Sequence, residues 1–169
     1  DPADVDSETL DSFEIGYRSF SSGLSYEVSL FTMRKENYHF RDGSDYYETD
    51  GETSHEGVEL ELDWQINDAL SLHSSVSWAK HEYAFNRDVT GGNALETITD
   101  GNYIDSAPKT LGNSTLRWQA TPRLSAAAQW EHVGSYYMDA SNTQKYDGHD
   151  LINLALNWNL REGVSLEGR

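Results

Sequence analysis

Residues 58–66 read VELELDWQI, a stretch in which apolar and polar side chains alternate strictly. Because successive side chains of a β-strand point to opposite faces, this alternation predicts a strand with one apolar and one hydrated face. The apolar set is Val58, Leu60, Leu62, Trp64 and Ile66. Similar alternation along the chain predicts strands over residues 9–20, 24–40, 54–66, 70–85, 109–120, 124–138, 150–160 and 164–169.

The composition narrows the class of protein. The 29 acidic and 12 basic residues give a net charge of -17, which opposes binding to nucleic acid. The chain has no cysteine, so neither a disulfide framework nor a thiolate metal site is possible. Apolar runs are too short for a membrane-spanning helix, which needs about 18 or more apolar residues in a row. A transmembrane β-barrel stays possible, because only every second residue of its strands is apolar.

The connections between the predicted strands alternate between short and long. Short turns lie at residues 21–23, 67–69, 121–123 and 161–163, and long polar loops lie at residues 41–54, 86–108 and 139–150. In an antiparallel sheet this order places all the turns at one end and all the loops at the other. Such asymmetry is typical of outer-membrane barrels, which have short periplasmic turns and longer extracellular loops.

Aromatic residues recur at fixed places on the apolar side of the predicted strands. Trp64, Trp118 and Trp158 each lie three residues before the first residue of a short turn. This spacing predicts a girdle of aromatic side chains at the membrane interface. The predicted girdle consists of Tyr17, Trp64, Trp78, Trp118, Trp130 and Trp158. The alternative is that these residues form the core of a soluble β-sandwich or a lipocalin-like barrel.

Three segments carry recognisable motifs: residues 8–18 read ETLDSFEIGYR, residues 55–61 read HEGVELE and residues 106–109 read SAPK. These segments resemble the PETxxSxEIGxK strand, the xxGVELE strand and the xAPxH strand entry, in that order. All three belong to the C-terminal barrel region of TonB-dependent outer-membrane receptors of the siderophore-receptor type, which this chain therefore resembles. The resemblance implies an all-β, antiparallel up-and-down transmembrane β-barrel of 22 strands. This chain is expected to be a fragment of about eight of those strands, without the plug domain.

The same resemblance implies a function. It predicts an uptake receptor in the outer membrane of a Gram-negative bacterium, in contact with outer-membrane lipid and most often specific for a ferric siderophore. The inner-membrane TonB complex would reach the receptor through the missing plug. We expect no enzymatic activity, no catalytic residue, no cofactor and no bound metal. Two alternatives are a small stand-alone outer-membrane barrel with a structural or adhesion role, and a soluble lipocalin-like ligand-binding barrel.

Tyrosines in or near the long loops are the candidate ligand contacts. Aromatic faces and phenolic hydroxyls suit siderophore surfaces, which present planar groups and many oxygens. The candidate residues are Tyr46, Tyr47, Tyr103, Tyr136, Tyr137 and Tyr146. An alternative interpretation of Tyr136 and Tyr137 is equally good: one belongs to an upper aromatic girdle and the other is its neighbour in the lumen.

Metal chemistry has weaker support in the sequence. Carboxylates in residues 41–52 could offer oxygen ligands to calcium, but their spacing fits no EF-hand, so a solvated acidic loop is the simpler interpretation. They are Asp42, Asp45, Glu48, Asp50 and Glu52. The pair His55-Glu56 lacks the second histidine of a zinc-protease motif.

Overall fold

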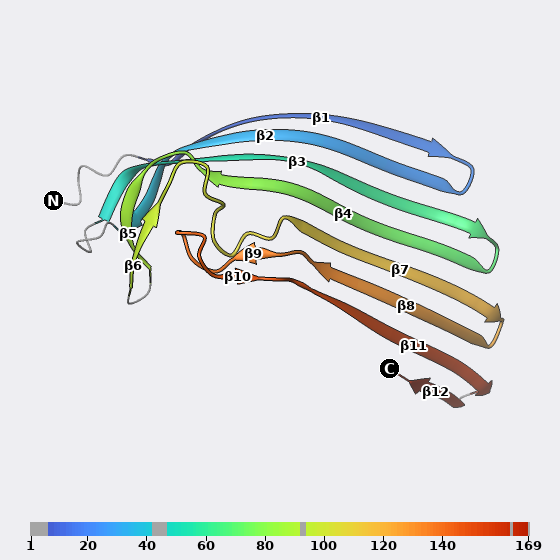
Figure 1. Ribbon diagram of the computed structural model, residues 1–169. Coiled ribbons are helices and arrows are strands. Elements are labelled where there is room, and N and C mark those ends of the chain that lie inside the picture. The colour runs from blue at the N-terminus through green and yellow to red at the C-terminus, as the bar shows by residue number, and fades with distance from the viewer. Residues whose placement is uncertain (1–6, 42–46, 92–93, 163, 169) are drawn as a thin grey trace.

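The computed structural model describes residues 7–41, 47–91, 94–162 and 164–168, and their long strands form one curved antiparallel sheet (Figure 1). The strands of this sheet are β1 (Thr9–Ser21), β2 (Leu24–Arg41), β3 (Tyr47–Asn67), β4 (Leu70–Tyr83), β7 (Thr110–Thr121), β8 (Leu124–Val133), β11 (His149–Arg161) and β12 (Val164–Gly168). They are joined in chain order, and within the described residues β1 and β12 remain open edges. The all-β, up-and-down fold is therefore confirmed, as a sheet that does not close on itself. No helix in the described part of the chain is long and apolar enough to cross a membrane.

Four shorter strands lie in the long connections. Strands β5 (Arg87–Gly91) and β6 (Ala94–Ile98) form a hairpin, and β9 (Tyr136–Tyr137) pairs with β10 (Lys145–Tyr146). Figure 1 shows these elements at one end of the sheet and the tight turns at the other.

These strands correct three predicted boundaries. The loop predicted over residues 86–108 contains a hairpin, and the strand predicted over 124–138 divides into β8 and β9. Strand β3 begins at Tyr47, seven residues before its predicted start at residue 54. Its first residues show no alternation of apolar and polar side chains, so the sequence gives no sign of a strand there. They still pair with the end of β2, because the hydrogen bonds of the ladder involve only the backbone.

The sheet has two chemically different faces. Cross-strand partners share a face, so the pairing of Ile15 with Leu30, Leu30 with Val58 and Val58 with Trp78 places these side chains together. We call this the apolar face; it includes Ile15, Leu30, Val58, Leu60, Leu62, Trp64, Trp118, Ile152, Leu154 and Trp158. The opposite side is the charged face; it includes Glu14, Arg18, Glu27, Glu59, Glu61, Asp63, His73, Arg117 and Glu131.

The apolar face is exposed along its length. Ile152 is 72% exposed and many other large apolar side chains of this face are also exposed. A soluble monomer rarely leaves an apolar patch of more than a few hundred Å² uncovered. The exposure therefore does not favour a soluble sandwich or lipocalin-like barrel.

Successive hairpins are staggered by a constant step. The hairpins are β1–β2, β3–β4, β7–β8 and β11–β12. The first residue of the second strand in one hairpin pairs with a tryptophan in the first strand of the next hairpin. That tryptophan also pairs, within its own hairpin, with the third residue of the second strand. The three steps are Leu24–Trp64–Leu72, Leu70–Trp118–Ala126 and Leu124–Trp158–Leu166. Each step shifts the turns by two residues over two strands. With a rise of about 3.3 Å per residue and a strand spacing of about 4.8 Å, this shift gives a strand tilt of about 35°, which is typical of barrels.

A cluster of buried apolar residues lies where the long connections meet the end of β4. Within the described residues, Tyr83, Val89, Ile98 and Ala140 form the buried cluster, with partly buried neighbours packed around it. Those neighbours are Tyr38, Phe40, Phe85 and Ile104. We call the described parts of residues 84–108 and 134–148 the loop layer. This layer has a small hydrophobic core of its own.

Candidate functional site

The loop layer lies over one end of the charged face. Strand β4 pairs without a bulge from Ser71 to Tyr83, so Tyr83 shares its face with His73 and His81. Val89 of β5 and Ile98 of β6 bury Tyr83 to 4% exposure. The β5–β6 hairpin therefore packs onto the charged face and not onto the apolar face.

Hydrogen bonds join loops that are far apart in the sequence. The backbone N–H of Ala140 donates to the Glu96 carboxylate at 2.6 Å. The Asn142 side chain bonds both backbone groups of Tyr103, accepting from its N–H at 2.7 Å and donating to its carbonyl oxygen at 2.7 Å. These contacts hold residues 94–105 and 139–142 as one unit.

Asp139 organises the turn that follows it. Its carboxylate accepts hydrogen bonds from the Thr143 hydroxyl at 2.7 Å and from the backbone N–H groups of Thr143 and Gln144 at 3.0 and 2.7 Å. Burial of Asp139 raises the pKa of its carboxyl group, but these hydrogen bonds outweigh that effect and hold the pKa below its ordinary value of 3.8.

This lowered pKa predicts an acid-sensitive turn. Because the folded-state pKa of Asp139 lies below its unfolded value, the stabilisation is complete above about pH 4 and is lost as the pH falls through the lowered pKa. In the full-length receptor, amide protection factors of Thr143 and Gln144 should stay constant from about pH 7 to about pH 5 and drop below about pH 4. The variant Asp139→Asn should lose this pH dependence. The exposed control Asp147→Asn should retain it, and a loss there would contradict the assignment.

A hollow opens in the loop layer beside its core. Its walls include Tyr38, Phe40, Tyr83, Glu96, Asp105 and Met138. The Tyr83 hydroxyl donates to Asp105 Oδ1 at 2.6 Å. Burial and this hydrogen bond raise the pKa of Tyr83, so its hydroxyl stays protonated and remains a donor. Burial and the nearby charge of Asp105 also raise the pKa of Tyr38, which lines the same hollow.

Four of the six predicted ligand tyrosines form two separate pairs. Tyr103 stacks on Tyr137 with ring centroids 6.1 Å apart, and Lys109 Nζ lies 3.6 Å from the Tyr103 centroid. Tyr136 lies 5.1 Å from Tyr146, whose hydroxyl bonds His149 Nδ1 at 2.8 Å. Tyr47 is the first residue of β3, and Tyr46 lies outside the described residues, as do Asp42 and Asp45 of the acidic loop. A ligand role for these tyrosines stays a prediction.

Sequence reasoning missed the residues of the hollow. Tyr38 and Phe40 lie among the last residues of β2, Tyr83 ends β4, and Phe85 follows it two residues later. The tilted rings of Tyr38 and Tyr83 have centroids 6.3 Å apart, and those of Phe40 and Phe85 are 5.0 Å apart. Two aromatic residues at spacing i, i+2 near the loop ends of β2 and β4, the two strands on either side of β3, were the available signal. Their partner Asp105 lies about twenty residues further along, in a loop whose path the sequence does not reveal.

The six predicted girdle residues all lie on the apolar face. Trp64, Trp118 and Trp158 occupy equivalent places, each opposite the third residue of the following strand, and are 43%, 52% and 47% exposed. Tyr17 pairs with Val28 and Trp78 with Val58 on the same face. Trp130 donates its indole N–H to Asp150 Oδ1 at 2.8 Å. The three tryptophans are equivalent because they occupy the same position in three hairpins that are shifted by a constant step.

The apolar face ends sharply at a charged row. Beyond Val58 and Trp78, the next pair on this face is Glu56 with Lys80, and Lys80 Nζ forms an ion pair with Glu82 at 2.7 Å. From Val58 to Ile66 the tilted strand rises about 22 Å, near the height of about 25 Å of the apolar band in outer-membrane barrels.

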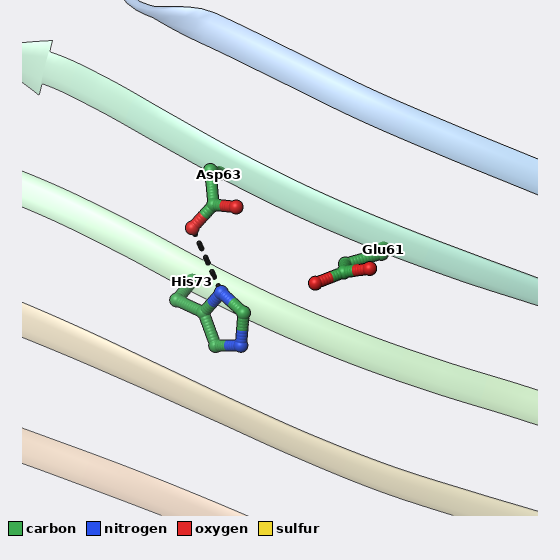
Figure 2. Close-up of side chains that lie close together, drawn as sticks. All are labelled: Glu61, Asp63 and His73. Atoms are coloured by element: carbon green, nitrogen blue, oxygen red, sulfur yellow. Dashed lines mark hydrogen bonds and ion pairs between the residues drawn. The ribbon is translucent and has the colours of Figure 1, made fainter. Parts of the chain in front are cut away.

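Within the residues that the structure describes, the charged face brings together one group of possible metal ligands. Figure 2 shows Glu61 and Asp63 of β3 beside His73 of β4, and His73 Nδ1 lies 2.8 Å from Asp63 Oδ1. One ligand atom from each residue lies within 4.8 Å of the others. Closer to the loop layer, His55 Nδ1 and His81 Nδ1 are hydrogen-bonded at 2.8 Å. Both groupings follow from cross-strand register, and we assign a metal ion to neither.

Comparison with known proteins finds close parallels to this fold. The family described as TonB dependent receptor-like, beta-barrel matches residues 1–169. "Probable TonB-dependent siderophore receptor PiuA" of Acinetobacter baumannii is 22% identical over 167 residues, which cover 96% of this chain and 22% of that protein. The "Ferrioxamine receptor" of Yersinia enterocolitica is 24% identical over 146 residues, which cover 85% of this chain and 19% of that protein.

A solved structure agrees with these sequence relatives. The crystal structure of the siderophore receptor PiuA from Acinetobacter baumannii superposes with a TM-score of 0.80 at 21% identity, over 94% of this chain and 23% of that one. The chain thus spans about a fifth of the length of the curated relatives that it matches. Since the family match extends over all 169 residues and the fold is that of a solved receptor barrel, the chain belongs to the TonB-dependent receptor-like β-barrel family.

Proposed function

We propose that this chain forms part of the wall of an outer-membrane receptor that imports a ferric siderophore into a Gram-negative bacterium. The observation that carries this proposal is the exposed apolar face, which is bounded by equivalent tryptophans near the turns and by a charged row near the loops. In this arrangement the apolar face contacts lipid, the charged face lines the lumen and the loop layer lies outside the cell.

Siderophore transport is supported by what the relatives are named. One is a probable siderophore receptor and another a ferrioxamine receptor. Their names describe transport receptors, and we propose no catalytic role for this chain. A small stand-alone barrel is not favoured, because these relatives are about five times as long as the chain. Coupling to the TonB complex is a general property of the family, and we assign none of these residues to it.

The test is iron uptake by the complete receptor. Cells that carry or lack its gene are grown under iron limitation with one ferric siderophore at a time as the sole iron source. We expect the gene to be needed for growth on at least one complex, and the protein to fractionate with the outer membrane. Equal growth of both strains on every complex would contradict siderophore uptake.

A further inference from the structure

Among the described residues, two carboxylates in the hollow of the loop layer have only neutral hydrogen-bond partners. Asp105 accepts from the Tyr83 hydroxyl and Glu96 from the backbone N–H of Ala140. Neither carboxylate forms an ion pair with a lysine or arginine within the part of the chain that the structure describes. Both side chains are half-buried, and a buried charge is costly unless an opposite charge balances it. The hollow therefore favours a guest that brings a positive charge.

The aromatic walls of the hollow also suit a cation. Lys35 Nζ lies 5.2 Å from the ring centroid of Tyr38, and the Arg87 guanidinium lies 5.6 Å from that of Phe40. Each of these cations is already neutralised, Lys35 by Glu8 at 2.7 Å and Arg87 by Asp50 at 2.6 Å. The chain thus places its own cations against the rings without neutralising the two carboxylates.

The surrounding loops carry a strong negative excess. Residues 41–54, 86–108 and 139–150 hold five, four and three acidic residues, with one arginine or lysine each. Such a surface attracts cations and repels anions before contact. Ferric complexes differ in this respect, because three hydroxamate groups cancel the charge of Fe³⁺, whereas three catecholate groups leave three negative charges.

We propose that this hollow binds a pendant organic ammonium group of the ligand and so selects ferric hydroxamate complexes that carry such a group over anionic ferric complexes. The ammonium group would lie between Asp105 and Glu96, which line the same hollow. This inference rests on the proposed siderophore uptake and names the class of complex that the loop layer admits.

The test compares two probes that differ only in one charge. One is the ferric complex of a linear trihydroxamate with a terminal ammonium group, and the other is the same complex with that amine acetylated. With the purified full-length receptor, we expect the ammonium complex to bind about tenfold more tightly. The double variant Asp105→Asn, Glu96→Gln should remove this preference, since it keeps both hydrogen-bond acceptors but removes both charges. The control Asp147→Asn, on an exposed loop position, should preserve it.

The other possible outcomes count either against this inference or against the proposed function. Equal affinity for the two probes, or a preference that survives in the double variant, would overturn the inference. Tighter binding of a ferric tris-catecholate complex than of either probe would overturn it too, while supporting siderophore uptake. Binding of none of the three complexes would count against the proposed function itself. Retention of heat-modifiable mobility in gel electrophoresis shows that each variant is folded.

Discussion

Replacing Ala128 with arginine is expected to impair insertion of the receptor into the outer membrane, whereas the same change at Ala127 should not. Ala128 lies on the apolar face between Leu116 and Leu154. It is four residues from the start of β8 and therefore near the middle of the apolar band. An arginine on the lipid face costs about 2–4 kcal/mol at the midplane of a transmembrane barrel.

Ala127 is a closely matched control. It is the preceding residue of the same strand, it is the same residue type, and it points to the charged face between Arg117 and Ala155. An arginine there meets water and a like charge, which costs at most about 1 kcal/mol. The measurement is the folded fraction of full-length receptor in outer membranes, followed by the free energy of unfolding in lipid vesicles. Equal losses from both substitutions would show that the apolar face does not contact lipid.

The sheet could be predicted from the sequence because its signals are local. Alternation such as VELELDWQI fixes which side chains share a face, and the turn residues fix where each hairpin reverses. Once the turns are placed, the equal spacing of Trp64, Trp118 and Trp158 fixes the register within each hairpin, whereas the stagger between hairpins comes from pairings such as Leu24 with Trp64. Two predicted bounds on the sheet were wrong: the polar start of β3, where no alternation marks the strand, and the end of the strand predicted over 124–138, where β8 stops at Val133.

The loop layer could not be predicted, because its contacts join residues that are distant in the sequence. Glu96 meets Ala140 across 44 residues, and Tyr103 meets Asn142 across 39. Neither pair belongs to a periodic pattern, and polar loop residues have many alternative partners. The ligand role of the predicted tyrosines stays a prediction, and the hollow is lined by other residues, among them Tyr38, Tyr83 and Asp105.

The second large effect is expected at Ile98, the most buried apolar residue of the loop layer. It is 2% exposed and packs with Tyr83, Val89 and Ala140. Replacing a buried isoleucine with alanine costs about 2–5 kcal/mol, because the lost contacts leave a cavity. This core is small, so we expect Ile98→Ala to open the loop layer locally while the strand ladder stays intact.

Leu95 provides the control from the same strand, since it is 65% exposed, and Leu95→Ala should change the local stability by less than about 0.5 kcal/mol. Amide hydrogen exchange of the full-length receptor separates the two variants. Protection should fall in residues 83–105 for Ile98→Ala alone, and it should remain in β7 and β8 for both. If Ile98→Ala left protection of the β5–β6 hairpin unchanged, this core would not be what holds the loops over the charged face. Because Ile98 also lines the hollow, ligand binding should weaken together with the protection.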